Sequence, residues 1–477
     1  TNGWATKAPA ELGMDAALLD AACKYALEFD GNADGNPDTN TQGVVIVRGG
    51  AIVKECYAAG KGPDDPATSW SAAKSFASTL IGIAIDDGLI PNVDAKMSSF
   101  FPEWAADARD KIRLEDVLLM QSGLKFVEEY VAASEIVELF NSADGNAYMR
   151  ARPAAREPGS TWYYSSGDTQ LLGALVEQVT GKAAGDFAKE RIFDPLGMNA
   201  TQWWKDGSGH TAAYCCVDAP TREFAKFGLL ALREGQWDGK QIVSKAWIQK
   251  ATQTMAAHNE GYAYQWWTQG SLKKDIPQYP DLYWADGLDS QKIFVIPSLD
   301  LVVAKNTTYR KPAGGAEAAA GQGVLSKIAP RGISQNGGTV GPLVWEDVAL
   351  LAPIINSIEG ATPVDFTPTQ VGARPADPAA CREALQTGYG TFCEAVHGCA
   401  CDKCSVQMLD CNTNEGCAAI VNCALRTGCR GPGCVAPEAC GDVITQFSGT
   451  GTGGIETQMA LALSDCTVSS QCGVSCQ

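Results

Sequence analysis

Histidine is scarce in this chain of 477 residues, which contains only His210, His258 and His397. Histidine is the usual group that removes the proton from a nucleophilic serine, and none of the three lies beside a recognisable nucleophile. The Gly-x-Ser-x-Gly turn that exposes the serine of α/β hydrolases is also missing. These absences argue against a Ser-His-Asp triad.

The chain also has fewer basic than acidic residues, and it has few long apolar runs. The formal net charge is −18 and the pI about 4.7, which disfavours nucleic acid and anionic membranes as partners. No apolar stretch approaches the roughly 18 residues of a membrane span. The chain begins at Thr1 without an initiator methionine or a signal-like segment, as expected of a processed chain. We therefore expect a soluble protein with no membrane span and no nucleic-acid partner.

The 18 cysteines are distributed very unevenly along the chain. Fourteen of them lie between residues 381 and 476, and they follow a proline-rich segment over residues 361–380. We predict a large domain over residues 1–360, a linker over 361–380 and a cysteine-rich domain over 381–477. Fourteen is an even number, which favours seven disulfides in an exported, extracytoplasmic chain; a zinc site within residues 397–404 is the alternative.

Apolar patterns predict strands at both ends of the large domain. Residues 43–57 read as two strands joined at Gly49 and Gly50, and residues 292–306 repeat the design around Pro297. Helical periods lie between these segments, and a last helix is expected over residues 344–360. The order indicates an α+β fold, with an antiparallel sheet that is closed by distant segments and a helical insertion.

The segment "WSAAKSFASTLIGIAIDDG" places Ser71 and Lys74 three residues apart at the head of an apolar helix. The Ser-x-x-Lys pattern also occurs at residues 122–125 and 271–274, so the letters alone are weak. Residues three apart share one face of a helix, and a helix N-terminus favours a developing alkoxide. The pair is therefore either a nucleophile with its base or two polar residues at the start of a buried helix.

A tyrosine or a lysine can replace histidine as the base if its surroundings lower its pKa. The segment "REPGSTWYYSSGDTQLLG" offers Tyr164 on a loop that leads into a second apolar helix. The alternative is that Tyr164 is an aromatic residue that only fills space beneath that loop.

Three segments in this order resemble the signatures of the serine hydrolases related to class C β-lactamases: "SAAK", "LLMQSGL" at residues 118–124 and "PGSTWYYSSGDTQLLG". This family, which has the penicillin-binding-protein-like α/β sandwich, includes D-alanyl-D-alanine peptidases, esterases and 6-aminohexanoate-dimer hydrolases. The resemblance covers roughly residues 10 to 358. The segments "KSFASTLIGIAIDDGLI" and "FVEEY" look most like the 6-aminohexanoate-dimer hydrolase and carboxylesterase branch.

The resemblance implies a catalytic set of Ser71, Lys74 and Tyr164. Ser71 would be the acylated nucleophile, and Tyr164, kept partly ionised by Lys74, would accept its proton. The backbone amides of Ser71 and Leu288 would form the oxyanion hole. No metal or organic cofactor is implied for this two-step acyl transfer.

The implied substrate-binding residues are Tyr130, Ser166 and Gly287. Ser166 stands where β-lactamases have the asparagine of Tyr-x-Asn. The segment Ala285-Asp286-Gly287 stands where they have Lys-Thr-Gly, so the cationic residue is missing. Both departures argue against efficient hydrolysis of β-lactams.

Two further features carry expectations of their own. Residues 30–41 have the spacing of a calcium loop, although Thr41 stands where a bidentate glutamate belongs, so a polar surface loop is the alternative. Cys215 and Cys216 form either a vicinal disulfide or two packed thiols, and Cys23 is expected to pair with Cys56. The possible ligands of the structural Ca²⁺ are Asp30, Asn32, Asp34, Asn36 and Asp38.

We therefore expect an exported serine hydrolase that cleaves small or oligomeric amides and esters, 6-aminohexanoate oligomers among them. One alternative is a weak β-lactamase or D-Ala peptidase-like enzyme. A second is a non-catalytic module that recognises penicillin, and a third assigns the function to the cysteine-rich tail.

Overall fold

The structure, a computed structural model, describes residues 4–28, 41–128, 134–272, 275–288, 290–307, 346–366, 378–387, 394–429, 434, 439–448, 455–469 and 472. The chain divides into two compact units: residues 1–23, 40–325 and 353–364 form the first, and residues 24–39, 326–352 and 365–477 form the second. The predicted calcium loop and Tyr130 lie outside the described residues, so both assignments remain predictions.

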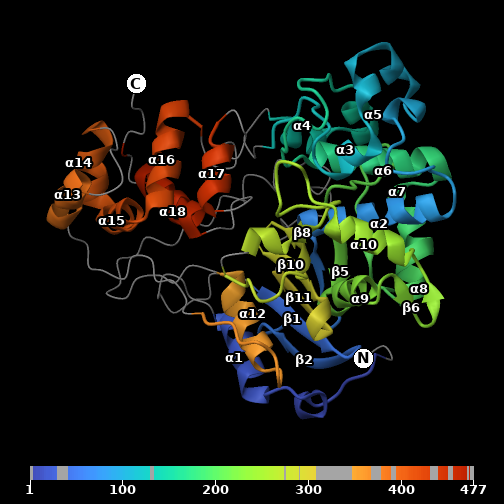
Figure 1. The fold of residues 1–477 in the computed structure, drawn as a ribbon, viewed down its shortest axis with the longest axis horizontal. Helices are drawn as coiled ribbons and strands as arrows, with labels where there is room; N and C mark the ends of the chain where they lie inside the picture. The colour runs from blue at the N-terminus through green and yellow to red at the C-terminus, as the bar shows by residue number, and fades with distance from the viewer. Residues whose placement is uncertain are drawn as a thin grey trace. The chain divides into compact units, whose positions relative to one another are not determined.

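The first unit is built on an antiparallel sheet of six strands (Figure 1). Its strands, in spatial order, are β2 (Ala51–Tyr57), β1 (Thr41–Arg48), β11 (Leu301–Thr307), β10 (Gln291–Ile296), β9 (Tyr283–Gly287) and β8 (Trp267–Thr268). Strand β1 pairs with β11, so that Ile46 lies opposite Val303. This pairing confirms the prediction that distant segments close the sheet.

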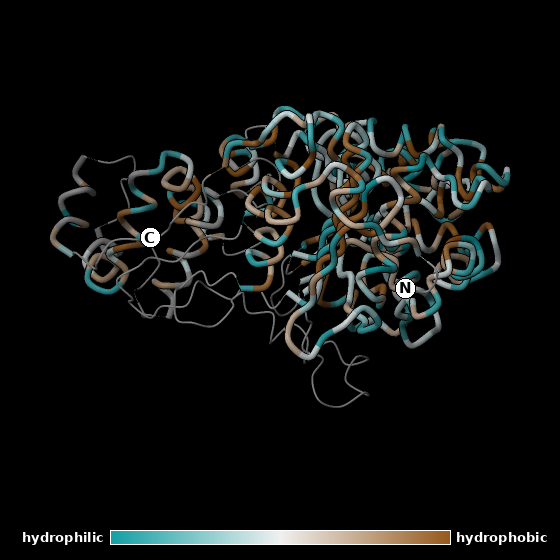
Figure 2. The backbone as a smooth tube through the Cα atoms, turned by 90° about the horizontal axis from the view of Figure 1, so that it is seen from below, coloured by the Kyte–Doolittle hydropathy of each residue, from teal (hydrophilic) through white to brown (hydrophobic). Residues whose placement is uncertain are grey.

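The turns that join β1 to β2 and β10 to β11 lie where the sequence predicts them. Gly49 and Gly50 have φ values of 58° and 76°, which only glycine adopts readily, and they join β1 to β2. The helical turn η8 (Pro297–Leu299) joins β10 to β11. Apolar residues gather inside the unit, whereas its outer loops are largely hydrophilic (Figure 2).

Helices cover the sheet and form the predicted helical insertion. Helix α9 (Thr221–Leu232) packs on β1, β10 and β11. A Cβ atom at Gly228 would lie 2.6 Å from a methyl carbon of Val302, so glycine permits this close approach. Helix α2 (Ala73–Asp86) packs against α6 (Ser166–Thr180) and α10 (Lys245–Gln253), and these helices position the candidate site.

The remaining elements of residues 1–366 are short or peripheral. The helices are α1 (Ala16–Glu28), α3 (Leu114–Leu118), α4 (Glu135–Asn141), α5 (Gly145–Arg150), α7 (Ala184–Ala188), α8 (Asp194–Leu196) and α12 (Asp347–Asn356). The strands are β3 (Pro66–Thr68), β4 (Gln202–Trp203), β5 (Val217–Pro220), β6 (Gln236–Trp237) and β7 (Lys240–Gln241). The single-turn segments are η1 (Pro9–Leu12), η2 (Trp70–Ala72), η3 (Met97–Ser99), η4 (Pro102–Ala106), η5 (Ala108–Lys111), η6 (Lys189–Phe193) and η7 (Gln269–Leu272).

The cysteine-rich tail is a set of short helices that disulfides cross-link. The helices are α13 (Pro378–Thr387), α14 (Glu394–Lys403), α15 (Ser405–Thr413), α16 (Glu415–Thr427), α17 (Gly441–Ser448) and α18 (Ile455–Ser469). The described disulfides join Cys381 to Cys401, Cys399 to Cys472, Cys404 to Cys466, Cys411 to Cys417, Cys423 to Cys440 and Cys429 to Cys434.

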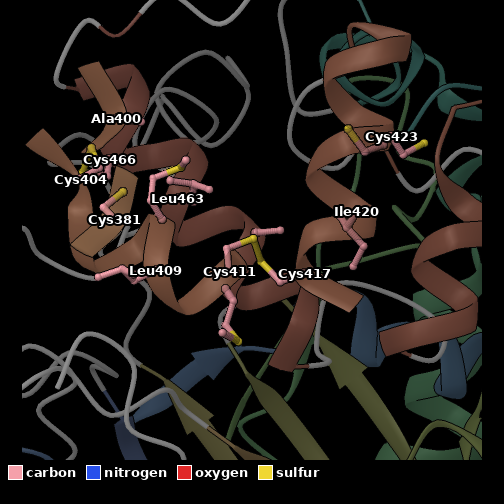
Figure 3. Packing of buried hydrophobic residues seen from close by; sticks show 14 of the residues in the cluster. Cys381, Ala400, Cys404, Leu409, Cys411, Cys417, Ile420, Cys423, Leu463 and Cys466 are labelled. Atoms are coloured by element: carbon pink, nitrogen blue, oxygen red, sulfur yellow. A yellow bond between two sulfur atoms is a disulfide. The ribbon is translucent and has the colours of Figure 1, made fainter. Parts of the chain in front are cut away.

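Half-cystines make up much of the buried core of the tail, together with Leu409, Ile420 and Leu463 (Figure 3). The sulfurs of Cys399, Cys401 and Cys404 are oxidised, so the alternative of a zinc site there is wrong. Cys393 and Cys476 lie outside the described residues. The expected disulfide between Cys23 and Cys56 is present in the first unit. Among the described helices, none has the length and apolar character that crossing a membrane requires.

Candidate active site

Ser71 lies in η2, immediately before α2, on a turn that is hydrogen-bonded to β5. Trp70 is buried and has a φ of 45°, a conformation that residues other than glycine rarely adopt. The amide of Ser69 donates to the Val217 carbonyl at 2.8 Å, and the Ser69 hydroxyl accepts from the Val217 amide at 2.9 Å. Strand β5 therefore holds the turn that presents Ser71.

Lys74 lies beneath Ser71 and is only 2% exposed. Its Nζ donates to Ser71 Oγ at 3.1 Å, to Ser166 Oγ at 3.0 Å and to the Tyr214 carbonyl at 2.9 Å. Burial lowers the pKa of Lys74 to about 8, and the nearby charge of Glu128 opposes this shift. A substantial fraction of Lys74 is therefore neutral near pH 8.

Tyr164 approaches Ser71 from the loop before α6. The side chain of Tyr164 lies close enough to that of Ser71 for hydrogen bonding to influence its pKa, and Lys74 Nζ lies 5.1 Å from the centre of the Tyr164 ring. Burial raises the pKa of Tyr164 well above 10, the charge of Glu128 adds to this effect, and the Ser71 hydrogen bond opposes it. These surroundings favour the protonated phenol over the partly ionised form that the resemblance implied.

Glu128 is a buried carboxylate that the sequence reasoning did not assign to the site. Its side chain is 7% exposed and accepts hydrogen bonds from Ser166 N at 2.7 Å and Ser166 Oγ at 2.6 Å. Its backbone amide donates to the Tyr163 hydroxyl at 2.7 Å, which gives Tyr163 a different role from Tyr164. The sequence signal was an acidic pair inside "FVEEY", close to an apolar helix.

The end of β9 packs against the turn that carries Ser71. A Cβ atom at Gly287 would lie 2.1 Å from the Ser69 carbonyl oxygen, a distance that no side chain can occupy. Leu288 follows directly in the chain, and its part in an oxyanion hole remains a prediction. Asp286, which replaces the threonine of Lys-Thr-Gly, accepts from Lys292 of β10 at 2.8 Å, so a cation from the neighbouring strand neutralises it.

Aromatic rings form a wall beside the candidate nucleophile. The rings of Tyr164 and Trp267 stack at 5.9 Å, and Tyr262 and Trp162 contact both of them. Trp267 is half-buried, whereas Tyr262 is almost fully buried. Trp267 therefore presents apolar surface next to Tyr164.

The vicinal disulfide between Cys215 and Cys216 is present, which decides between the two alternatives for this pair. Both half-cystines are buried, and Cys216 has a φ of 73°. They follow Tyr214 directly, and the Tyr214 carbonyl is a hydrogen-bond acceptor of Lys74. The bridge thus lies in the loop that supplies one wall of the lysine site.

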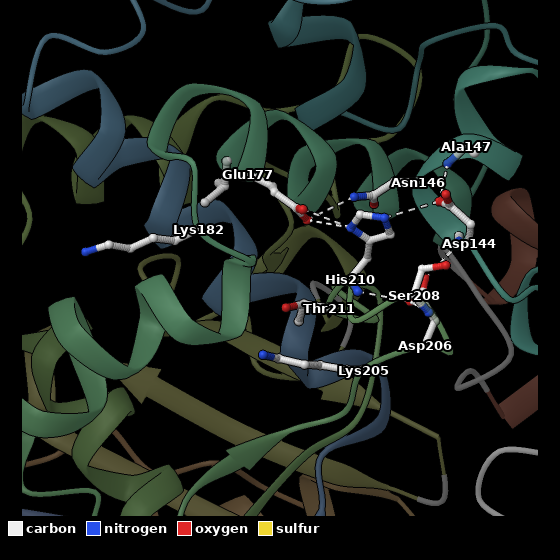
Figure 4. A network of polar contacts seen from close by, with 12 residues as sticks. Asp144, Asn146, Ala147, Glu177, Lys182, Lys205, Asp206, Ser208, His210 and Thr211 are labelled. Atoms are coloured by element: carbon white, nitrogen blue, oxygen red, sulfur yellow. Dashed lines mark hydrogen bonds and ion pairs between the residues drawn. The ribbon is translucent and has the colours of Figure 1, made fainter.

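The rings of His210 and His258, the two histidines whose side chains the structure describes, form their hydrogen bonds away from Ser71. His210 binds Glu177 through Nδ1 at 2.8 Å and lies 3.5 Å from Asp144 through Nε2 (Figure 4). Although burial opposes it, the hydrogen bond and charge of Glu177 raise the pKa of His210. His258 Nε2 lies 3.1 Å from the Gly159 carbonyl.

The surroundings of the site are open to solvent only in part. Ser71 and Tyr164 are half-buried, while Lys74 and Ser166 are buried. A cavity of about 420 Å³, lined by residues of α9 and α10 and by residues 280–283, does not include Ser71. Among the described residues, no group of His, Cys, Asp and Glu side chains is arranged to hold a metal ion.

The antiparallel sheet, the covering helices and the helical insertion define a β-lactamase-like fold. The family model described as Beta-lactamase matches residues 30–325, and the chain belongs to this family of serine hydrolases. The structural neighbours include a candidate β-lactamase from Bacteroides dorei, with a TM-score of 0.51 and 17% identity over 66% of this chain and 97% of that one. They also include a candidate 6-aminohexanoate-dimer hydrolase from Bacillus anthracis, with a TM-score of 0.50 and 20% identity over 60% of this chain and 80% of that one.

Two relatives by sequence are named as a hydrolase and an esterase. The 6-aminohexanoate-dimer hydrolase of Paenarthrobacter ureafaciens is 26% identical over 299 residues, which cover 58% of this chain and 74% of the relative. The lovastatin esterase of Penicillium rubens is 28% identical over 165 residues, which cover 30% of this chain and 40% of the relative.

Proposed function

We propose that this protein is an exported serine hydrolase that cleaves amide or ester bonds through an acyl-enzyme on Ser71. The observation that carries this proposal is the 3.1 Å contact between Ser71 Oγ and the desolvated amine of Lys74. The described disulfides support export, because such bonds persist in oxidising compartments.

Acylation begins with proton transfer within this pair. Neutral Lys74 takes the proton of Ser71 as the Oγ atom attacks the carbonyl carbon, and the electron pair of the C=O bond moves to its oxygen. The amides of Ser71 and Leu288 stabilise that oxyanion. Lys74 is the proton acceptor here in place of Tyr164, since the pKa of Tyr164 lies well above 10.

Tyr164 acts in this scheme as a neutral acid. When the tetrahedral intermediate collapses, the bond to the leaving group breaks and the departing amine or alcohol takes the phenol proton. The proton on Lys74 then replaces it. Water repeats the sequence on the acyl-enzyme and releases the acid.

The substrate class follows from the surroundings of Ser71. Trp267 and Tyr164 offer an aromatic surface to an apolar acyl chain. Ala285 stands at the lysine position of Lys-Thr-Gly and Lys292 is paired with Asp286, so in the described part of the chain no cation stands at that motif to bind a substrate carboxylate. Small amides and esters, 6-aminohexanoate oligomers among them, fit these features and the names of the two relatives better than β-lactams do.

The test is covalent labelling with a fluorophosphonate together with turnover of a p-nitrophenyl ester. We expect a mass shift on the peptide that contains Ser71, and loss of both labelling and turnover in Ser71→Ala. Ser75→Ala is the matched control, because Ser75 is a buried serine on the same helix whose hydroxyl donates to the Gln265 carbonyl.

The same experiment separates the alternatives. Labelling without turnover of esters, amides or penicillins would favour a recognition module. Faster turnover of penicillin than of any ester would favour a weak β-lactamase. Absence of labelling would contradict the proposed function.

A further inference from the structure

We propose that Glu128 is a positioning residue that acts through Ser166 to direct the lone pair of neutral Lys74 at Ser71. This inference rests on the proposed function and adds a second layer of residues to it. It is carried by a continuous series of hydrogen bonds from a buried carboxylate to the candidate nucleophile.

The first step concerns the single proton of the Ser166 hydroxyl. Glu128 Oε1 accepts from Ser166 Oγ at 2.6 Å, and Oε2 accepts from Ser166 N at 2.7 Å. A hydroxyl has one proton to donate, so this contact leaves Ser166 Oγ only its lone pairs for Lys74. Ser166 must therefore accept a hydrogen bond from Lys74, at 3.0 Å.

The second step concerns the amine of Lys74. A neutral amine has two N–H bonds and one lone pair. The Tyr214 carbonyl can only accept, and Ser166 is forced to accept, so these two partners take both N–H bonds. The lone pair is left to face the third partner, Ser71 Oγ, at 3.1 Å. In this state the Ser71 hydroxyl donates to Lys74, which is the direction that proton removal requires.

The third step concerns charge. When Ser71 attacks, its O–H bond breaks and the proton becomes the third N–H of Lys74, so an ammonium forms in a buried site. Such a charge is costly unless an opposite charge is near. Glu128 is buried behind Ser166 and its charge raises the pKa of Lys74 against the effect of burial. The carboxylate therefore stabilises the product of proton transfer from behind Ser166, which donates two hydrogen bonds to it.

Ser166 also explains a departure of this chain from the β-lactamase motif. The asparagine of Tyr-x-Asn would bring an amide group that both donates and accepts at this position. Ser166 instead joins an amine and a carboxylate through one small hydroxyl, and it is 1% exposed. We therefore propose that Ser166 orients the catalytic base, Lys74, rather than contacting substrate.

The test replaces Glu128 with Gln in the full-length protein. In the carboxylate, Oε1 and Oε2 each accept one hydrogen bond from Ser166. A carboxamide has an oxygen at only one of these two positions, and its N–H group at the other would turn the Ser166 hydroxyl toward Lys74. Loss of the negative charge also lowers the pKa of Lys74. We expect the rising limb of ester kcat/KM to move to lower pH by about one unit. We also expect kcat to fall by roughly ten- to a hundredfold, with KM unchanged.

Glu223→Gln is a closely matched control. Glu223 is 3% exposed and, like Glu128, accepts from one backbone amide and one hydroxyl, those of Ala200 and Thr201. The Glu223→Gln substitution should change the thermal stability of the protein. It should change neither kcat nor the pH at which ester kcat/KM rises. A purely structural role for Glu128 predicts the same outcome for both variants.

The possible outcomes test the role of Glu128 separately from the proposed function. If Glu128→Gln changes neither kcat nor the pH at which ester kcat/KM rises, the proposal is overturned. If that variant does not fold, Ser166→Ala decides, because it removes the link and should slow fluorophosphonate labelling of Ser71; an unchanged labelling rate would overturn the proposal. Failure of the wild-type protein to label at Ser71 would instead contradict the proposed function.

Discussion

The two regions of this protein obtain their order from different forces. Residues 41–307 surround a sheet whose central strands are buried, and two disulfides are described in the first unit. Residues 381–477 have few large apolar residues, and half-cystines of five of the six described disulfides fill much of their core. Apolar burial decreases the need for cross-links, and cross-links replace burial where a core is small.

This difference has a functional consequence. Burial in the first unit does more than stabilise the fold, because it also sets the pKa values of Lys74 and Tyr164. The tail contains no comparable lysine site among its described residues. The comparison predicts that the two regions can be damaged independently, and that chemistry is lost only with the first.

The largest expected effect is on catalysis and follows from replacing Lys74 with Met. This variant removes the proton acceptor, so ester kcat/KM should fall by about a thousandfold. Lys226→Met is the matched control, since Lys226 is 6% exposed and donates to the Gly197 carbonyl away from Ser71. Equal losses in both variants would show that any buried lysine matters for folding alone.

The next effect concerns the contact between β9 and the nucleophile turn. In Gly287→Ala the new methyl group would meet the Ser69 carbonyl at 2.1 Å, so the turn or the strand must move. Loss of alignment at the oxyanion hole should lower kcat by roughly a hundredfold. Gly398→Ala, in open space on a tail helix, should leave ester kinetics unchanged. Full activity in Gly287→Ala would contradict the assigned oxyanion hole.

A stability effect confined to the tail comes next. The disulfide between Cys404 and Cys466 spans 62 residues, and replacing both cysteines with serine should destabilise the tail by about 2 to 5 kcal/mol. Limited proteolysis should then cleave residues 381–477 faster, while ester kcat stays at the wild-type value. A matching loss of activity would refute the independence of the two regions.

The smallest effect is expected from the vicinal disulfide. Replacing Cys215 and Cys216 with alanine relaxes the loop after Tyr214, whose carbonyl binds Lys74. Other hydrogen bonds still hold this loop, including that from Trp203 Nε1 to the Cys215 carbonyl at 2.7 Å. We expect a decrease in kcat of only about tenfold or less, by the usual worth of one neutral hydrogen bond. A loss as large as that of Lys74→Met would make the disulfide essential to the site.

Much of the fold of the first unit could be predicted from its sequence. Apolar runs and paired glycines located β1 and β2, and the repeat around Pro297 located β10 and β11. Local patterns singled out Ser71 and Tyr164 as candidates, whereas their catalytic roles followed from a family resemblance. These features depend on short-range order or on motifs that the chain retains.

The errors and omissions have a common physical cause, which is that burial arises only from tertiary structure. Tyr164 was expected to be partly ionised, yet its surroundings raise its pKa. Glu128 was given no role from the sequence, yet it lies buried against Ser166. The state of Cys215 and Cys216 depends on a backbone conformation that sequence does not reveal.

The most direct measurement is the rate of fluorophosphonate labelling of Ser71 in the wild-type protein as a function of pH. Lys74 must be neutral to accept the proton, so the rate should be low in acid and rise through an inflection near pH 8. A rate that is independent of pH, or one that rises only near pH 10 and above as a phenol ionises, would contradict the account.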